Sequence, residues 1–343
     1  MNQSAGDAAK AAWARIMPFL RPVEALIGDP DVSDIEINGE RGVFFEKEGR
    51  MEQAAGIRVA EQSLQVAARN IARALGDEIS EECPLLDSRL PDGSRVAIVL
   101  WPVSVGGTSV SIRKFQHKRY GPEELVRSGM IPREVLEELV AAIVNRRTIL
   151  ISGGTGTGKT TLLNALCVFI PDDERLIVIE DTSEIQIGKP NVVPLEARRG
   201  QADLPGISIG DLLRQALRMR PDRIILGEVR GAEGFDLLQA LNTGHQGSLS
   251  TIHANSATQA LTRLSTCVMM AGIDLPHRAV RANVADALDY LVHIERRAGR
   301  RFVAEVLRIR GYNSTGDTYE LESVYDNRNH GGNEGGPKYE PRH

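Results

Sequence analysis

A glycine-rich segment in the middle of the chain constrains its fold more than any other feature. The segment consists of Gly153, Gly154, Thr155, Gly156, Thr157, Gly158, Lys159, Thr160 and Thr161. It matches the pattern G-x4-G-K-[ST], follows an apolar strand-like run at 148–151 and precedes an apolar run with helical character at 162–166. A strand, a glycine loop and a helix in this order predict one unit of a parallel α/β sheet. A glycine-rich turn that matches by chance would lack both flanking elements.

The chemistry of this segment predicts binding of a nucleoside triphosphate. Glycines let the backbone curl so that successive N–H groups point at phosphate oxygens, and the N-terminus of the following helix adds a partial positive charge. Lys159 is expected to reach the β- and γ-phosphates, and Thr160 is expected to hold Mg²⁺. We therefore predict ATP and Mg²⁺ as the cofactors of this chain.

The pattern around this segment predicts a RecA-like P-loop domain over residues 134–325. Strand-like runs alternate with helical runs, as a parallel sheet requires. The expected strands are 148–152, 175–180, 223–227 and 248–252, and the expected helices are 159–169, 208–219 and 231–243. Residues 256–289 are expected to be mostly helical and 290–325 to form a β-meander. Residues 326–343 have two Gly-Gly pairs and no apolar pattern, which predicts a disordered tail.

A smaller α+β domain is expected over residues 1–115. Its predicted elements are strands 34–38, 43–47, 95–100 and 108–113 and a helix at 62–76. A helix over 8–27, kinked at Pro18 and Pro22, is expected to pack on this domain. Its polar face lacks the lysine-rich stripe typical of a helix that lies on a membrane. Residues 116–133 are rich in breakers and charge, which predicts a linker.

The composition narrows the classes of function. The net charge is −5, from 41 Lys+Arg and 46 Asp+Glu, which disfavours a dedicated nucleic-acid binder. The three scattered cysteines include no CxxC pair, so neither a zinc site nor a disulfide framework is indicated. The longest uncharged run, 96–112, is broken by proline and glycine and predicts short strands, not a membrane span. We expect a cytoplasmic protein with no direct nucleic-acid binding and only peripheral contact with a membrane.

Two predicted strands end in acidic residues, Glu180 and Glu228. Hydrolysis of ATP needs one carboxylate that orients or deprotonates water and another near the Mg²⁺ shell. We predict these two glutamates, with Lys159, as the catalytic residues; the alternative is that each is a solvent-facing acid at a strand end. Gly227 stands where the common P-loop pattern has an aspartate. Thr160, water and Glu180 are therefore expected to share the metal.

A third strand ends at His253, which could donate a hydrogen bond to a γ-phosphate. A lone histidine after a strand is more often structural. These residues alone do not separate a motor from other P-loop proteins. A switch GTPase would carry an N-K-x-D motif, and none is present. A small-molecule kinase remains open on this reasoning.

Taken together, four segments resemble the secretion ATPase superfamily of type II and type IV secretion, type IV pili and conjugation. They are the P-loop at 153–161, an acidic box at 179–184, a Walker B region at 218–231 and a histidine box at 243–255. The resemblance is strong over 120–270 and looser over 30–115. The absent zinc module, together with segments 90–96 and 111–115, favours the conjugal-transfer and type IV secretion (TrbB-like) branch. The tight-adherence pilus and type II members are the alternatives.

The resemblance implies a homohexameric motor ATPase at the cytoplasmic face of the inner membrane, with inner-membrane components of the secretion machine as partners. Each subunit would pair a PAS-like N-terminal domain with a RecA-like domain, with ATP between them. Arg95, Arg113, Arg230 and His253 are then expected to contact the nucleotide. A regulatory ATP-binding scaffold with slow turnover is the alternative from another class, and the cargo stays open.

Overall fold

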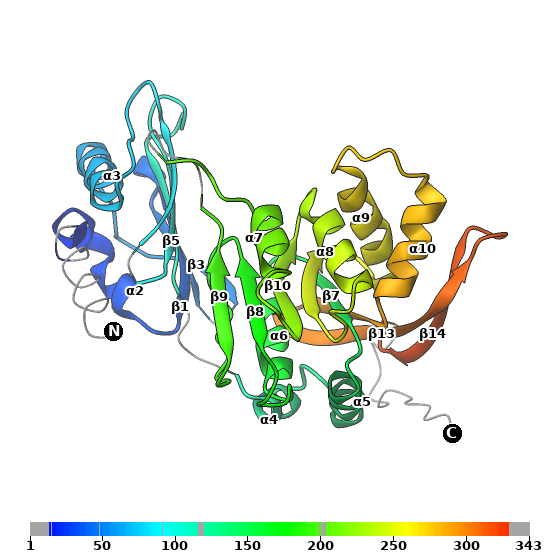
Figure 1. The fold of residues 1–343 in the computed structure, drawn as a ribbon. Helices are drawn as coiled ribbons and strands as arrows, with labels where there is room; N and C mark the ends of the chain where they lie inside the picture. Colours follow the sequence, from blue (N-terminus) through cyan, green and yellow to red (C-terminus); the bar gives the residue numbers. More distant parts are fainter. Residues whose placement is uncertain are drawn as a thin grey trace. The chain divides into compact units, whose positions relative to one another are not determined.

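The chain divides into two compact units, residues 1–119 and 120–343, and each is described by itself. The computed structural model describes residues 14, 16–47, 49–90, 92–115, 120–198, 200 and 204–328. Figure 1 traces both units along the sequence. The expected tail falls outside the described residues from 329 onward, and so does the expected N-terminal helix before residue 14 and at residue 15.

The first unit is built on a six-stranded antiparallel sheet with the order β3-β2-β1-β6-β5-β4. Its strands are β1 (Val32–Asn38), β2 (Val43–Lys47), β3 (Arg50–Gln53), β4 (Leu85–Arg89), β5 (Arg95–Val99) and β6 (Ser109–Arg113). Sequence patterning did not predict β3 and β4. Every residue of β3 is exposed, so this strand carries no alternation of apolar and polar positions from which a pattern could be recognised.

One face of this sheet packs against helices, and the other carries polar side chains. The helices are η1 (Arg21–Val23), α2 (Glu24–Gly28) and α3 (Glu61–Leu75), with a further helical stretch at 16–20, and η2 (Gly39–Arg41) is a single turn. Val96 and Ile112 are buried in the core of this unit. Because side chains alternate along a strand, the neighbouring Arg95 and Arg113 point to the opposite face.

The second unit holds an eight-stranded mixed sheet with the order β14-β13-β12-β7-β11-β10-β8-β9. Its strands are β7 (Ile149–Gly153), β8 (Leu176–Glu180), β9 (Val192–Glu196), β10 (Arg223–Val229), β11 (Leu249–His253), β12 (Tyr290–Arg297), β13 (Arg300–Asn313) and β14 (Thr318–Asp326). The strands from β12 to β9 pair in parallel, and β13 and β14 add antiparallel edge strands. The predicted fold class, an α/β domain preceded by a smaller α+β domain, is confirmed.

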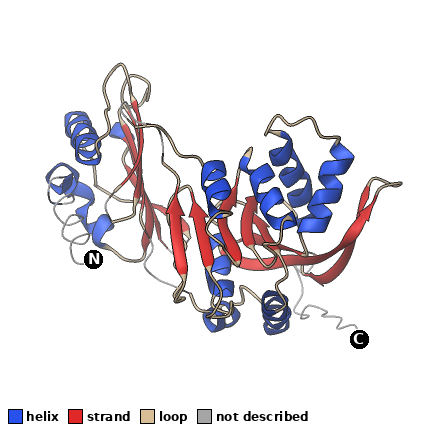
Figure 2. Cartoon of the chain, viewed as in Figure 1, coloured by secondary structure: helices blue, strands red, loops and turns tan. Residues whose placement is uncertain are grey.

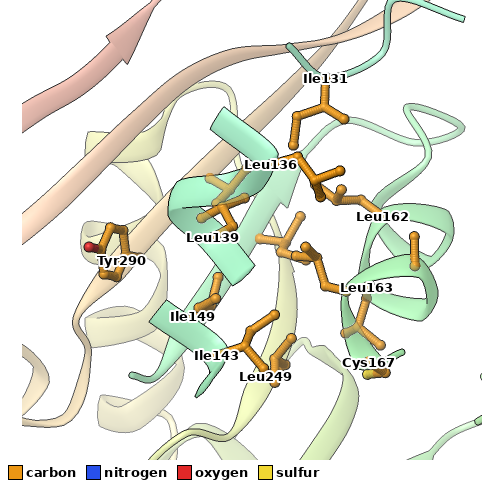
Figure 3. Packing of buried hydrophobic residues seen from close by; sticks show 14 of the residues in the cluster. Ile131, Leu136, Leu139, Ile143, Ile149, Leu162, Leu163, Cys167, Leu249 and Tyr290 are labelled. Atoms are coloured by element: carbon orange, nitrogen blue, oxygen red, sulfur yellow. The ribbon is translucent and has the colours of Figure 1, made fainter. Parts of the chain in front are cut away.

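Helices cover both faces of this sheet (Figure 2). They are α4 (Pro122–Arg127), α5 (Arg133–Val144), α6 (Lys159–Cys167), α7 (Ile209–Ala216), α8 (Glu233–Asn242), α9 (Ala257–Met269) and α10 (His277–Ala287). Ile149 and Ile151 of β7 pack with α5 and α6, as Figure 3 shows for Ile149. Leu150 packs with α7 to α10 on the other face. The buried run of β7 therefore reflects a strand covered on both sides. The helix α4 lies in the stretch expected to be a linker.

Candidate active site

The glycine-rich loop joins the end of β7 to the start of α6, as its sequence predicted. A Cβ on Gly153 would lie 2.6 Å from the backbone oxygen of Ile294, so only glycine fits beside the neighbouring strand. Gly158 caps α6 with φ at +96°, a left-handed conformation that favours glycine. Thr160 and Thr161 follow Lys159 in the first turn of α6. This geometry is a phosphate-binding loop at the N-terminus of a helix.

Lys159 lies inside this loop, with a side chain that is largely buried. Its ammonium donates hydrogen bonds to the carbonyl oxygens of Gly154 at 3.0 Å and Gly153 at 3.2 Å. The same nitrogen lies 3.3 Å from Nδ1 of His253. The loop's own carbonyl groups thus hold a cation beneath the curled backbone, which has no room for a Cβ at Gly153. A cation in this position can bind the phosphates of a nucleotide.

The order of the strands brings His253 and Glu228 next to this lysine. The strand β11 lies between β7 and β10, and His253 is in register with Gly153. The three strands are parallel, so their carboxyl ends share one edge of the sheet. Nε2 of His253 lies 2.7 Å from Oε1 of Glu228. The side chains of Lys159, His253 and Glu228 thus form a continuous line across three strands.

Only one of the two carboxylate oxygens of Glu228 accepts a hydrogen bond within the described residues. Oε2 accepts a hydrogen bond from Nε of Arg230 at 2.7 Å. Oε1 is buried and accepts no hydrogen bond in the described part of the structure, since the His253 contact is short but not aligned as one. A buried carboxylate oxygen without a donor is costly. A water molecule that the carboxylate orients for attack on a phosphate would satisfy it.

Arg230 contacts acidic side chains from two strand ends. Besides Glu228, its guanidinium reaches a carboxylate oxygen of Asp181 at 3.3 Å. Its own backbone N–H, with that of Gly231, donates to Oε1 of Glu233 at 2.6 and 2.8 Å. The sequence suggested a nucleotide contact for Arg230, whereas the structure pairs it with carboxylates that lie after β8 and in β10.

Glu180 has a structural partner that its sequence position did not reveal. Its Oε1 accepts hydrogen bonds from the backbone N–H groups of Glu184 at 2.9 Å and Ile185 at 3.0 Å. Burial raises the pKa of Glu180 to about 7, against the opposing effect of those two donors. A Cβ on Gly227 would lie only 2.9 Å from Cγ of Glu180. The glycine in place of the common aspartate therefore has a packing cause, because Glu180 occupies that space.

The pKa of His253 is lowered, first by burial and then by the neighbouring Lys159, while Glu228 acts in the opposite direction. The imidazole is therefore held neutral near neutral pH. A neutral ring can accept a hydrogen bond from the lysine at Nδ1, and its Nε2 then keeps a proton on the side of Glu228.

A cavity of about 250 Å³ opens beside the loop. It is lined by Gly154, His253, Ala254, Asn255, Gln259 and Arg263. The last two residues come from α9, and Nη2 of Arg263 donates to the backbone oxygen of Arg230 at 3.4 Å. The sequence motifs did not indicate Gln259 or Arg263. Both residues lie in the helix that follows the strand ending at His253, within ten positions of that histidine. This closeness in sequence was the signal by which they could have been found.

The predicted arginines of the first unit form a row across its sheet. Arg95 lies opposite Arg113 on β6, and it also lies opposite Arg89 on β4. The register thus adds Arg89 to the two arginines that the sequence indicated. Asp34 of β1 lies opposite Arg113 and is the acidic neighbour in this row.

Two further sequence expectations concern metals and membranes. Within the described ranges, no group of three or more His, Cys, Asp or Glu side chains could hold a metal ion by itself. Within the same ranges, no helix has the length and apolar character needed to cross a bilayer. Cys83, Cys167 and Cys267 are free thiols.

The fold and the site define a P-loop NTPase: a phosphate-binding loop between a buried strand and a helix, with a histidine and a carboxylate from the two next strands. The profile of the family described as "Type II/IV secretion system protein" matches residues 20–316. The chain belongs to this family and is an NTP hydrolase of the secretion ATPase type.

Individual relatives specify the branch. The conjugal transfer protein TrbB of Rhizobium radiobacter is 36% identical over 290 residues, which cover 83% of this chain and 86% of that protein. The type IV secretion system protein PtlH of Bordetella pertussis is 35% identical over 329 residues, covering 88% and 97%. The structure of the Legionella pneumophila ATPase DotB matches with a TM-score of 0.58 at 22% identity, covering 84% and 79%, and supports the fold alone. The predicted resemblance to the conjugal-transfer and type IV secretion branch is confirmed.

Proposed function

We propose that this chain is the ring-forming motor that hydrolyses ATP with Mg²⁺ to power a type IV secretion or conjugal transfer apparatus. The observation that carries the proposal is the line of Lys159, His253 and Glu228 across three parallel strand ends. It supports the proposal because a phosphate-binding cation and a general base would then lie on the same edge of the sheet.

Binding of the triphosphate uses the loop and its lysine. Backbone N–H groups of the loop donate to phosphate oxygens, and the ammonium of Lys159 exchanges the carbonyl oxygens of Gly153 and Gly154 for phosphate oxygens. Thr160, with Glu180 through water, would hold Mg²⁺, which neutralises charge on the phosphates. Burial favours the protonated form of Glu180, so its carboxyl group would contribute more to holding Mg²⁺ as the pH rises above about 7.

Hydrolysis uses the carboxylate of Glu228. Its Oε1, which lacks a hydrogen-bond donor in the described structure, would accept a hydrogen bond from the attacking water and take its proton as the water oxygen bonds to the γ-phosphorus. The bond between that phosphorus and the β,γ-bridging oxygen breaks in the same step, so that ADP leaves and inorganic phosphate is formed. Arg230 holds the other oxygen and so fixes the direction of the carboxylate. His253 lies between Lys159 and Glu228, and we infer that it contacts the γ-phosphate and responds to its loss.

The test is the variant Lys159→Ala. We expect loss of ATP hydrolysis and of most nucleotide affinity while the circular dichroism spectrum stays that of the wild type, because the ammonium contacts the loop and not the core. Turnover at the wild-type rate by a folded Lys159→Ala protein would refute the assignment. Tight ATP binding with negligible turnover by the assembled wild type would instead indicate a regulatory scaffold.

The same proposal includes assembly and the first unit. Nucleotide shared between parts of a homohexamer would stabilise the ring, and solution mass with a non-hydrolysable ATP analogue tests this. Arg113 and Arg95 would contact the phosphates, since planar guanidinium donors stabilise the developing charge. Arg113→Ala is expected to lower kcat in rings of unchanged mass. Undiminished turnover in those rings would exclude a catalytic part for this row.

The cellular setting follows from the named relatives. TrbB is described as a conjugal transfer protein and PtlH as a type IV secretion system protein. From these relatives we infer that the chain acts in the cytoplasm at the inner membrane, with peripheral association through inner-membrane components of the machine. The net charge of −5 supports the further inference that it does not contact nucleic acid directly. ATPase activity that is unchanged by added DNA at low salt is the corresponding observation.

A further inference from the structure

A strongly basic hairpin lies against the outer side of the P-loop. The end of the hairpin formed by β12 and β13 spans residues 296–301, and four of these six residues are arginines. Arg296 lies opposite Arg301 across the hairpin, and Arg297 lies opposite Arg300. Like charges directly opposite each other destabilise a strand pair. The two arginine pairs therefore do not stabilise the hairpin itself.

The row of Arg296 and Arg301 faces the phosphate loop. Nε of Arg301 donates a hydrogen bond to the backbone oxygen of Gly156 at 2.9 Å. A Cβ on Gly158 would lie 3.6 Å from Cδ of Arg301, and one on Gly156 would lie 3.6 Å from Nη1 of Arg296. Two guanidinium groups thus flank the middle of the loop from outside.

The second row faces elsewhere. A guanidinium nitrogen of Arg297 lies 2.7 Å from Glu295, and Nη1 of Arg297 donates to the backbone oxygen of Arg328 at 3.1 Å. The Cζ of Arg297 also lies over the ring of Phe302, 5.4 Å from the ring centre. The hairpin therefore offers two arginine rows of equal charge, only one of which contacts the nucleotide loop.

The position of Arg301 is fixed by the core beneath it. The backbone N–H of Val303 donates to the backbone oxygen of Met130 at 2.7 Å. Met130 is buried, and its Cε lies 3.0 Å from the position of a Cβ on Gly158. The hairpin strand, Met130 and the loop are thus packed together, so the guanidinium is held at the loop from a defined place.

The contact has a consequence for the interior of the loop. A peptide unit is planar and trans, so the carbonyl of Gly156 and the N–H of Thr157 point in opposite directions. A guanidinium that holds the carbonyl outward turns this N–H inward, toward the phosphates, and polarises it as a donor. We propose that Arg301 is a positioning residue of the phosphate cradle: it clamps the Gly156 carbonyl so that the loop is preorganised for the β-phosphate. The inference rests on the proposed nucleotide binding at this loop.

The test compares Arg301→Met with Arg300→Met. Methionine at position 301 keeps an unbranched stem beside Gly158 and removes the guanidinium. Arg300→Met removes the same charge from the other arginine row and is the matched control. Affinities for Mg·ADP and for inorganic pyrophosphate are measured by calorimetry on the full chain. We expect Arg301→Met to weaken both ligands about tenfold, which is about 1.4 kcal/mol, and Arg300→Met to change neither by more than about twofold.

Steady-state kinetics add a readout that a purely structural role would not produce. The cradle grips the phosphate in the ground state and in the transition state alike, so KM for ATP should rise about tenfold in Arg301→Met with kcat nearly unchanged. Equal losses in both variants would show a general charge effect and overturn the proposal, as would wild-type affinity in Arg301→Met. Failure of the wild type itself to bind ADP would refute the proposed function instead.

Discussion

Burial of the Glu180 carboxylate should make the second unit less stable as the pH rises. The pKa of this group is raised by burial from 4.5 to about 7, so the folded chain binds a proton that the unfolded chain has already released. Its contribution to stability is complete below pH 4.5 and is lost as the pH rises through about 7. At 1.36 kcal/mol for each pH unit, the loss is about 3 kcal/mol.

Glu180→Gln removes the ionisation while keeping an oxygen for the N–H groups of Glu184 and Ile185. We expect the variant and the wild type to have similar unfolding free energies near pH 4.5, and the variant to be about 3 kcal/mol more stable above pH 8. For a unit of about 200 residues this corresponds to a difference of about 6 to 12 °C in Tm.

The assay is calorimetric melting of the nucleotide-free chain from pH 4.5 to 8.5. Glu137→Gln, which changes an exposed carboxylate on α5, is the matched control and should follow the wild type. A constant difference between Glu180→Gln and the wild type across this range would refute the argument from burial. In the same variant, ATP turnover should fall, because the proposed water-mediated contact to Mg²⁺ loses its charge.

Two further predictions concern β10. Gly227→Ala puts a Cβ 2.9 Å from Cγ of Glu180 and should lower the unfolding free energy, measured by urea denaturation, by about 1–3 kcal/mol. Gly188→Ala, which places its Cβ in open space, is the matched control. Equal stability of both variants would contradict the packing explanation. Glu228→Gln should keep the affinity for Mg·ATP within about threefold and lower kcat at least about 100-fold, because an amide cannot accept the proton of the attacking water. Single-turnover hydrolysis measures the rate of the chemical step. A rate near that of the wild type would exclude Glu228 as the base.

Local sequence determined the parts of this protein whose signals lie within a few consecutive residues. The P-loop, its flanking strand and helix, and the acids at two strand ends are such features, since loop curvature, helix capping and burial of an apolar run act over short distances. The strands β3 and β9 lacked such local signals, and the helix α4 lay where breakers and charges suggested a connection. The helix α5 carries apolar residues at helical spacing, so this helix could have been predicted from the sequence.

Tertiary structure alone decided which of these side chains meet. Nothing in the local patterns places β11 between β7 and β10, yet this order brings His253 to Lys159 and Glu228. The reason that residue 227 is a glycine lies on a different strand, where the side chain of Glu180 fills the space that a Cβ would need. The contact of Arg301 with Gly156 spans 145 positions in the chain. Such contacts depend on strand order and register, which are set by the packing of the whole sheet and not by the residues adjacent in sequence.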